Sequence, residues 1–527
     1  MAEDDVEDVL KRDSETLHRF GYAQELARRM SAFSNFAMSF MIIGVFASVC
    51  VDIQQGISTA GMFGITVVWL VGCLIACSTA VSLGEISSAI PTAGGIYHWA
   101  SVLGGRGWGW ASAWVNLLAY MFTLGGTAVS AYLLFKQMIL GWVLHLDTSG
   151  WGYGHQCAGV LIIIGSQAVF NHVGVRALAR LGRVGAYVTF AGAIALMTVL
   201  LRNAHLANIV HMLDFVNNTG PAGGEVVPHT SNPLLIFGYA LLLPLWIISS
   251  YDASAHTSEE TVDAARAVPR AMISSVLLSA VTGIALFASL GLAMENPAEI
   301  ARQGVNAFAK LFEDVSAPAI VKNFIPSTLV LANYIGGACI LTGFSRAVFS
   351  FARDSGLPSA LKRVSPRHRT PAPAIWACAI VGVGATLYSP AFDALVAGTA
   401  LFYQLSYSMA ILPAMLSKNR TYGPFQLGVW SKPLGMLALL GCVFMFWVAI
   451  HPPTSILISY LIAVFGLLLI GWFALERRRF PGPPMGELAI RERQAEIHAH
   501  EEALSHDSSA DGHSRTRIRA SGTSSAL

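Results

Sequence analysis

The fold is decided by two stretches, Ser34-Asn-Phe-Ala-Met-Ser-Phe-Met-Ile-Ile-Gly44-Val-Phe-Ala and Pro244-Leu-Trp-Ile-Ile-Ser-Ser-Tyr-Asp252-Ala-Ser-Ala-His-Thr-Ser-Glu-Glu260. They lie in the first and sixth hydrophobic segments of the chain. Each segment is long enough to cross a membrane, and each is interrupted by polar or helix-weakening residues. The sequence therefore predicts two broken helices at matching positions in two halves of the chain.

The composition requires lipid as the solvent. Hydrophobic residues make up 54% of the chain and charged residues only 12%, against about 25% charged residues in ordinary soluble domains. A chain of this composition cannot cover its apolar surface with polar groups in water. We therefore expect an all-α protein that lies in a lipid bilayer.

Twelve apolar stretches are long enough to cross a hydrocarbon core of about 30 Å as helices. Their approximate spans are 32–51, 62–83, 108–134, 157–172, 184–202, 233–257, 271–294, 325–352, 374–389, 396–416, 433–450 and 455–475. The sequence divides into a cytoplasmic N-terminal segment (1–30), a twelve-helix domain (31–475) and a charged, Ser- and His-containing tail (476–527). The tail has few large apolar side chains, so we expect it to be disordered.

The distribution of Lys and Arg predicts that both termini are cytoplasmic, because cytoplasmic loops carry the excess of these residues. With the N-terminus inside, 27 basic residues lie inside and only Arg302, Lys310 and Lys322 lie in outside loops. The long loop 203–232 contains no Lys or Arg. Since topology accounts for the basic residues, the net charge of +2 indicates no nucleic-acid partner. We expect a multi-pass protein of the cell membrane, and the oligomeric state stays open.

A pair of broken helices at corresponding positions is the best sequence indicator of a transporter's binding site. A break leaves unpaired N–H groups at the start of one half-helix and unpaired carbonyls at the end of the other, so it can hold a carboxylate and an ammonium. We place Met41, Ile42, Ile43, Gly44 and Val45 at the first break and Ser249, Ser250, Tyr251 and Asp252 at the second. The alternatives are that Gly44 permits close helix packing and that the polar residues cap a helix.

Four separated motifs resemble the amino acid/choline (GABA permease-like) branch of the amino acid-polyamine-organocation superfamily. They are the N-terminal signature from Phe20 to Ala37, the loop Glu85-Ile-Ser-Ser-Ala-Ile-Pro-Thr-Ala-Gly-Gly-Ile-Tyr97, the sixth helix and its loop from Tyr251 to Arg270, and Ser345-Arg-Ala-Val-Phe-Ser-Phe-Ala-Arg-Asp354-Ser-Gly-Leu-Pro358. They occur in the order of that family and extend the resemblance over residues 20 to about 475.

The resemblance implies two inverted five-helix repeats (about 31–202 and 233–416), two peripheral helices (433–475), unwinding of helices 1 and 6, and alternating access of one small substrate. The sequence departs from the family at two places. Ser250 stands where many relatives have glycine, and Gly44 stands alone where several members of the superfamily have two glycines. Both departures touch the expected substrate site.

Asp252 is the most informative single residue, because a carboxylate inside a membrane costs at least about 2.5 kcal/mol unless it is paired, neutral or hydrated. It is a candidate for binding a substrate amine, for carrying a coupling proton, or for accepting hydrogen bonds from helix N–H groups. Glu85, near the inner end of the second helix, is a candidate cytoplasmic gate, with a structural acid as the alternative.

Polar faces on three further helices complete the candidate set. Asn116 and Tyr120 share a face of the third helix, Tyr403 lies on the tenth, and all three are candidates for contact with substrate. Thr342 and Ser345 of the eighth helix are candidate sodium ligands together with carbonyls of the first helix. Some proton-coupled relatives replace the sodium with a lysine in helix 5, but no lysine lies between Val184 and Leu201. The coupling ion, H⁺ or Na⁺, therefore stays open.

Three classes of function have to be distinguished for this chain: a transporter, a sensor and an enzyme. The leading hypothesis is a secondary transporter of an amino acid or a related amine such as GABA, with a choline, polyamine or other organic-cation permease as its alternative. A transporter-like nutrient sensor is the second class. An enzyme would need a nucleophile with a base, or a cluster of metal ligands, inside the spans. The sequence shows neither pattern, and we expect no cofactor, no metal and no catalytic residue.

Overall fold

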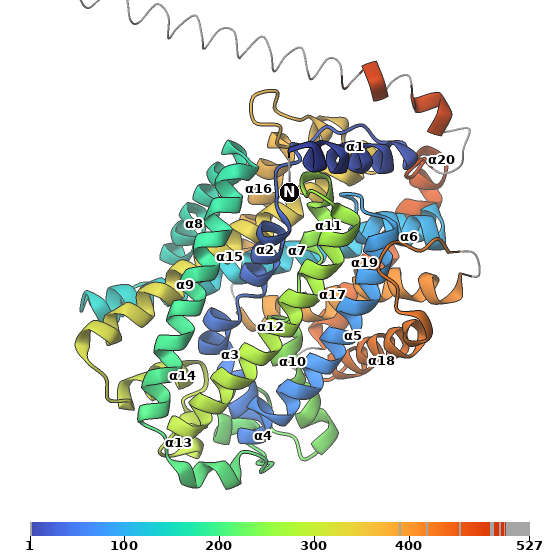
Figure 1. The fold of residues 1–527 in the computed structure, drawn as a ribbon. Helices are drawn as coiled ribbons and strands as arrows, with labels where there is room; N and C mark the ends of the chain where they lie inside the picture. Colours follow the sequence, from blue (N-terminus) through green and yellow to red (C-terminus); the bar gives the residue numbers. More distant parts are fainter. Residues whose placement is uncertain are drawn as a thin grey trace, which may run out of the picture.

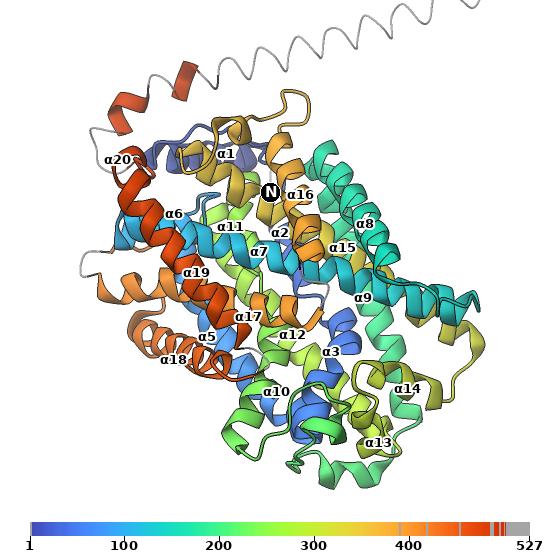
Figure 2. The same cartoon turned by 180° about the vertical axis from the view of Figure 1, so that it is seen from behind.

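The computed structural model describes residues 3–388, 392–417, 420–452, 455–484, 490–494, 497–499 and 501. Helices make up nearly all the regular structure of these residues (Figures 1 and 2). Met30 and Thr261 form the one isolated β-bridge among them. Most of the predicted tail, 476–527, lies outside the described residues.

The helices of the first half are α1 (Glu3–Arg19), α2 (Ala32–Ile43), α3 (Val45–Ala60), α4 (Met62–Ile65), α5 (Val67–Ala89), α6 (Ile96–Gly104), α7 (Arg106–Leu134), the π-helix η1 (Phe135–Val143), α8 (Tyr153–Val173) and α9 (Val175–Arg202). The loop that follows contains two 3₁₀ turns, η2 (Leu206–His211) and η3 (Gly220–Gly223).

The second half contains α10 (Pro233–Ile247), α11 (Ala253–His256), η4 (Ser258–Glu260), α12 (Ala264–Ala293), α13 (Pro297–Arg302), η5 (Gly304–Asn306), α14 (Ala307–Asp314), α15 (Ala319–Arg353), η6 (Ser359–Lys362), α16 (Ala372–Tyr388) and α17 (Phe392–Leu416). The last elements are η7 (Gly428–Trp430), α18 (Ser431–Ala449), α19 (Ile456–Gly471), η8 (Trp472–Glu476) and α20 (Arg477–Arg479).

Ten helices of the described chain are long and apolar enough to cross a membrane, and two shorter apolar helices, Pro233–Ile247 and Ala372–Leu387, occupy the sixth and ninth predicted segments. The sixth segment gives only a short helix because the chain leaves helical geometry after Ile247. The third segment is longer than predicted, because η1 continues α7 to Val143. The structure therefore supports a multi-pass membrane protein, and the count of twelve crossing helices stays a prediction.

The broken segments lie in the middle of the bundle. α2 packs against α9, α12 and α15, and α7 packs against α15 and α17. In contrast, α19 is almost wholly exposed at the edge of the bundle (Figure 2). The polar residues of the broken segments are therefore buried among neighbouring helices.

The loops gather at two opposite ends of the bundle. The N-terminal segment contacts the loop after α15, where Arg369 donates to the carbonyls of Gln24 and Glu25. The loop 203–232 lies at the other end with α4, α13 and α14 (Figure 1). There the Asn218 N–H donates to the Thr59 carbonyl at 2.9 Å. The predicted inside and outside loops are therefore separated in space.

Candidate functional site

The first helix breaks at Gly44, as predicted. α2 ends at Ile43, α3 begins at Val45, and Gly44 between them has φ 56° and ψ 33°. This left-handed geometry favours glycine, because a Cβ would crowd the backbone. The break also lies against α15, since a Cβ built on Gly336 would be only 2.7 Å from the Met41 carbonyl oxygen.

The second break extends from Ile248 to Asp252, between α10 and α11. Ser250 has a φ of 61°, the left-handed region that the glycine of many relatives would enter without strain. Its N–H donates to the Tyr407 hydroxyl at 3.0 Å. That hydrogen bond satisfies a backbone donor that the break leaves without a helical partner.

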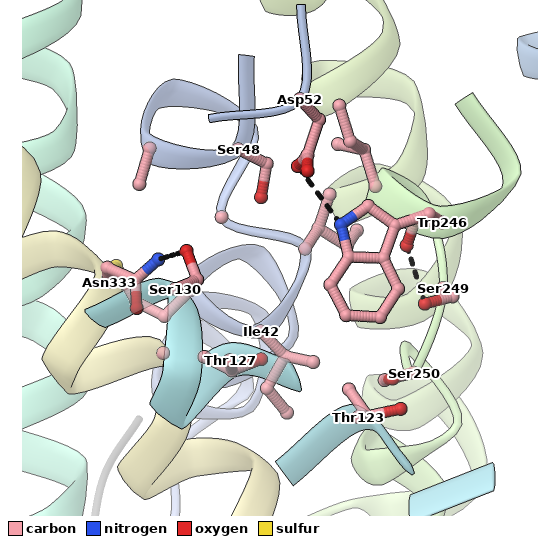
Figure 3. Close-up of a pocket in the computed structure, with 16 residues that line it drawn as sticks. Ile42, Ser48, Asp52, Thr123, Thr127, Ser130, Trp246, Ser249, Ser250 and Asn333 are labelled. Atoms are coloured by element: carbon pink, nitrogen blue, oxygen red, sulfur yellow. Dashed lines mark hydrogen bonds between the residues drawn. The ribbon is translucent and has the colours of Figure 1, made fainter. Parts of the chain in front are cut away.

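The two breaks lie side by side. The Ser39 hydroxyl on α2 donates to the Tyr251 carbonyl at 3.2 Å, and the Asn35 amide donates to the Ser254 carbonyl at 3.1 Å. A small cavity with a volume of about 30 Å³ lies between the breaks (Figure 3). Its lining residues are Met41, Ile42, Ile43, Gly44, Ala47, Ser48, Asp52, Thr123, Thr127, Ser130, Trp246, Ile247, Ser249, Ser250, Asn333 and Gly336.

The cavity contains half of the predicted substrate residues. Met41, Ile42, Ile43, Gly44, Ser249 and Ser250 line it, whereas Val45, Asn116, Tyr120, Tyr251, Asp252 and Tyr403 do not. The Ser250 side chain is buried in the wall of this cavity, where its hydroxyl is available to a bound ligand or water.

The cavity wall contains one carboxylate, Asp52, that is not among the predicted site residues. Asp52 is on α3 and is only 4% exposed, and the Trp246 indole N–H donates to its Oδ2 atom at 3.0 Å (Figure 3). The predicted first span ended at residue 51, so Asp52 was placed outside the membrane segment. Because α3 continues to Ala60, Asp52 lies within the helix and beside the break.

Asp252 is fully buried and belongs to a polar cluster outside the cavity lining. The Tyr407 hydroxyl donates to its Oδ1 atom at 2.9 Å, and the Asn116 amide donates to its Oδ2 atom at 3.1 Å. His256 Nε2 lies 3.4 Å from the same Oδ2 atom. Asn116 and Asp252 are predicted site residues. His256 is not, because its partners come from distant parts of the chain.

The contacts of His256 determine where its protons are. Nδ1 lies 2.8 Å from the Ala93 carbonyl oxygen, which can only accept, so Nδ1 carries a hydrogen. Nε2 faces the Asn116 Oδ1 atom at 3.2 Å and the Asp252 carboxylate, which are also acceptors. A neutral imidazole has a single N–H. The geometry therefore needs one further proton, on either His256 Nε2 or the Asp252 carboxylate.

Tyr120 and Tyr403 lie against this cluster. The Tyr120 ring is 5.6 Å from the His256 ring and 5.5 Å from the Tyr403 ring, centroid to centroid. Both hydroxyls are buried and lie near each other and near the Asp252 carboxylate, so they extend this polar cluster.

The hydroxyls of Thr342 and Ser345, the predicted sodium ligands, form hydrogen bonds within the protein. The Thr342 hydroxyl donates to Asn171 Oδ1 on α8 at 2.8 Å, and the Ser345 hydroxyl donates within α15. Ser345 Oγ also accepts a hydrogen bond from Arg346 at 3.1 Å. Arg346 in turn forms a fully buried ion pair with Glu260. A guanidinium beside Ser345 opposes the binding of a sodium ion there, because like charges repel.

Glu85 holds the loop after α17. Its carboxylate pairs with Arg420 and accepts the Leu427 N–H at 2.8 Å and the Ser431 hydroxyl at 2.7 Å. These partners tie the C-terminal part of α5 to the start of α18. Both predicted roles of Glu85, a cytoplasmic gate and a structural acid, stay open.

A second set of charges closes the same end of the bundle. Arg353 forms a bidentate pair with the buried Glu259, at 2.8 and 3.0 Å, and Tyr22 donates to Asp354 at 2.7 Å. Burial raises the pKa of the Glu259 carboxyl, but Arg353 outweighs that effect and the net pKa is lowered. The pKa of Asp354 is likewise lowered, because hydrogen bonding and charge from His98 outweigh burial.

The amino-acid sequence matches a known protein family. The family model described as amino acid permease matches residues 33–475. The chain belongs to the amino acid permease family. The permease is 27% identical over 502 residues to "Amino-acid permease BAT1" of Arabidopsis thaliana, with 89% of this chain and 95% of the plant protein covered.

Two other relatives show the range of names in this group. A rice protein named "Amino-acid permease BAT1 homolog" is 28% identical over 514 residues, covering 89% of the permease and 94% of the rice protein. A Candida albicans protein named "Putative polyamine transporter" is 24% identical over 510 residues, covering 91% and 90%. The match with each relative extends over most of both chains.

Proposed function

We propose that the permease is a secondary active transporter that moves an amino acid or a related small amine, such as GABA, across the cell membrane by alternating access. The observation that carries the proposal is the cavity lined by residues of both helix breaks, Gly44 and Ser250 among them. The N-terminus of α3 offers N–H groups to a carboxylate, and the C-termini of α2 and α10 offer carbonyls to an amine. Organic cations are the alternative substrates, because the Candida relative is named a putative polyamine transporter.

The architecture that we propose has twelve crossing helices, with inverted repeats at about 31–202 and 233–416 and peripheral helices at 433–475. Support comes from the ten long and two short apolar helices, the two matched breaks, and the exposed position of α19. Both termini are cytoplasmic in this proposal. The loops at the N-terminal end of the bundle are rich in basic residues, whereas the loop 203–232 at the other end has none.

Protons are the coupling ion in this proposal. The pair of Asp252 and His256 needs one proton in the observed geometry, and that proton is buried between α7, α11 and α17. Loss of the proton would leave Nε2 of His256 facing two acceptors, which would drive the pair apart. A rearrangement at α11 would move the second break, so proton binding and cavity shape are linked.

Uptake into proteoliposomes tests the function. Radiolabelled neutral, acidic and basic amino acids, GABA, choline and polyamines would be offered while the proton and sodium gradients are imposed separately. We expect saturable uptake of at least one amine-bearing zwitterion, driven by the proton gradient in the absence of sodium. Binding of these compounds without any saturable uptake would favour a sensor over a transporter.

A further inference from the structure

Three segments that are far apart in the sequence form a cleft of about 610 Å³ at the N-terminal end of the bundle. Its walls come from the N-terminal segment, from the end of α15 with the loop that follows it, and from the C-terminal tail at Arg493 and Ile497. Figure 1 shows α1 and α20 at this same end. The cleft shares no lining residue with the cavity between the helix breaks.

The tail side of the cleft is held by contacts with the N-terminal segment. The Gln24 N–H donates to Glu501 Oε1 at 2.7 Å, and His18 Nε2 lies 2.9 Å from the same oxygen. Ile497, which lies between Arg493 and Glu501 in the sequence, is only 5% exposed. These described residues of the tail therefore pack on the N-terminal segment and complete the cleft.

Lys362, Arg363 and Arg493 bring three positive charges into this cleft. Lys362 and Arg363 are exposed, and Arg493 is half-buried. None of the three forms an ion pair with another described residue. One carboxylate, Glu25, lines the same cleft, so the cations outnumber it. Because converging like charges repel one another, a bound anion would lower the free energy of this arrangement.

Arg353 also lines the cleft, on the side nearest the bundle, and its side chain is 8% exposed. Its charge is matched by Glu259, its bidentate partner. The guanidinium carbon lies 3.9 Å from the centroid of the Tyr22 ring, and the Tyr22 hydroxyl donates to Asp354. Buried contacts therefore fix this side of the cleft, and a ligand can reach the exposed cations without displacing the buried pair.

We infer that the cleft is a binding site for clustered phosphate groups, carried by the inositol-phosphate headgroup of a membrane lipid or by a soluble polyphosphorylated molecule. Guanidinium and ammonium groups are the usual protein partners of phosphate. A phosphate monoester carries about −1.5 to −2 charges, more than a carboxylate, and so offsets a cluster of cations better. The inference goes beyond the proposed transport function and does not depend on it.

The size and the position of the cleft fit this ligand class. Ligand pockets measure about 300–1,000 Å³, so a cleft of about 610 Å³ has room for more than one phosphate. In the proposed topology the cleft faces the cytoplasm, where basic pockets of membrane proteins recognise anionic headgroups. A ligand that binds both Arg363 and Arg493 would hold the loop after α15 to the tail. It should therefore stabilise the folded protein.

Isothermal titration calorimetry on the full-length protein in a neutral detergent tests the site. The two probes are inositol hexakisphosphate, which is soluble, and a short-chain phosphatidylinositol bisphosphate, which carries the lipid headgroup. We expect saturable binding of at least one probe and a higher unfolding temperature of the wild type when that probe is present.

Two double variants separate the cleft from the general charge of this end of the bundle. Arg363→Gln combined with Arg493→Gln should weaken binding roughly tenfold or more, because two charge-assisted contacts with phosphate are lost. Arg367→Gln combined with Arg478→Gln is the matched control. It removes two exposed arginines that do not line the cleft, and it should change the affinity by less than about twofold. Unfolding temperatures measured without probe show whether both variants are folded.

The outcomes decide both the site and the source of the phosphates. Failure of both probes to bind saturably would overturn the inference. Equal weakening by the two double variants would also overturn it, because the attraction would then be to the overall charge of this end. Where only the cleft variant weakens binding, tighter binding of the lipid probe identifies a membrane lipid as the ligand, and equal or weaker binding identifies a soluble phosphate. These measurements involve no uptake, so failure of the transport proposal would leave their result unchanged.

Discussion

His256 Nε2 lies 3.4 Å from Asp252 Oδ2, with both side chains fully buried. His256 is one helical turn beyond Asp252, so the pair joins the last residue of the second break to the end of α11. Tyr407 donates to the other Asp252 oxygen and accepts the Ser250 N–H from within the break. A change in the proton content of the pair therefore affects the break at Asp252 itself and, through the Tyr407 hydroxyl, at Ser250.

Asp252→Asn should fold and insert normally, but its uptake should no longer be coupled to the proton gradient. The amide is nearly isosteric and costs less to hold in a membrane, while His256 no longer has a carboxylate to share a proton with. We expect initial uptake, measured from pH 5 to pH 8, to fall more than tenfold. Tenfold corresponds to about 1.4 kcal/mol in the barrier, well below the cost of disturbing a buried charge pair.

Asp263→Asn is the matched control for this variant, because Asp263 is a partly exposed carboxylate in the loop before α12. Its uptake should stay within twofold of wild type across the same pH range. A folded Asp252→Asn protein with unchanged rate, affinity and pH profile would assign Asp252 to structure. The site would then consist of the backbone around Gly44 and the hydroxyls of Ser249 and Ser250.

Gly44→Ala should destabilise the protein by about 1–2 kcal/mol, the cost of a left-handed conformation for a residue with a Cβ. The new Cβ would also lie 3.3 Å from the Met41 carbonyl oxygen. Thermal unfolding in detergent measures the effect. Gly165→Ala is the control, since Gly165 lies inside α8 with nothing within 4 Å of a built Cβ, and there alanine should stabilise the helix by up to about 1 kcal/mol. Equal stability of Gly44→Ala and wild type would show that the break does not need glycine.

The ion pairs at the N-terminal end should not titrate between pH 5 and 8. The pKa values of Glu259 and Asp354 are lowered from their usual 4.5 and 3.8. A carboxyl with a lowered folded-state pKa contributes its full stability above the unfolded value and loses it as the pH falls through the folded value. Thermal unfolding of wild type and Glu259→Gln, which leaves Arg353 without its partner, should therefore differ by a constant amount, about 3 kcal/mol, from pH 5 to pH 8. The difference should shrink only below about pH 4, and a difference that changes between pH 5 and 8 would contradict the assignment.

The helix breaks were predictable because they depend on local sequence. Gly44 and Ser249-Ser250 interrupt long apolar runs, and backbone geometry responds directly to such interruptions. Asp52 was missed because the predicted span ended one residue before it, and helix boundaries are the least certain feature of a sequence-based assignment. His256 was missed for another reason, since Asn116 and Ala93 are 140 and 163 residues away in the chain. Such a cluster is created by packing and has no local signal.

Cysteine-accessibility labelling tests the proposed topology. Single cysteines in 203–232 and 295–324 should react with an impermeant reagent added outside intact cells, and cysteines in 353–373 should react only after permeabilisation. The reason is that cytoplasmic loops carry the excess of Lys and Arg. In the proposed topology, 27 basic residues lie inside and 3 lie in outside loops. Reaction of cysteines at positions 355–370 in intact cells would show that the orientation is the opposite of the proposed one.

The most direct test of the central claim is substrate-driven proton movement in sodium-free proteoliposomes, followed with a pH-sensitive dye in the lumen. Addition of a transported amine to wild-type vesicles should acidify the lumen, and the initial rate should saturate with substrate concentration. Vesicles with Asp252→Asn should show no acidification above the leak of empty vesicles. Saturable substrate uptake by the wild type that moves no protons and requires sodium would contradict the account.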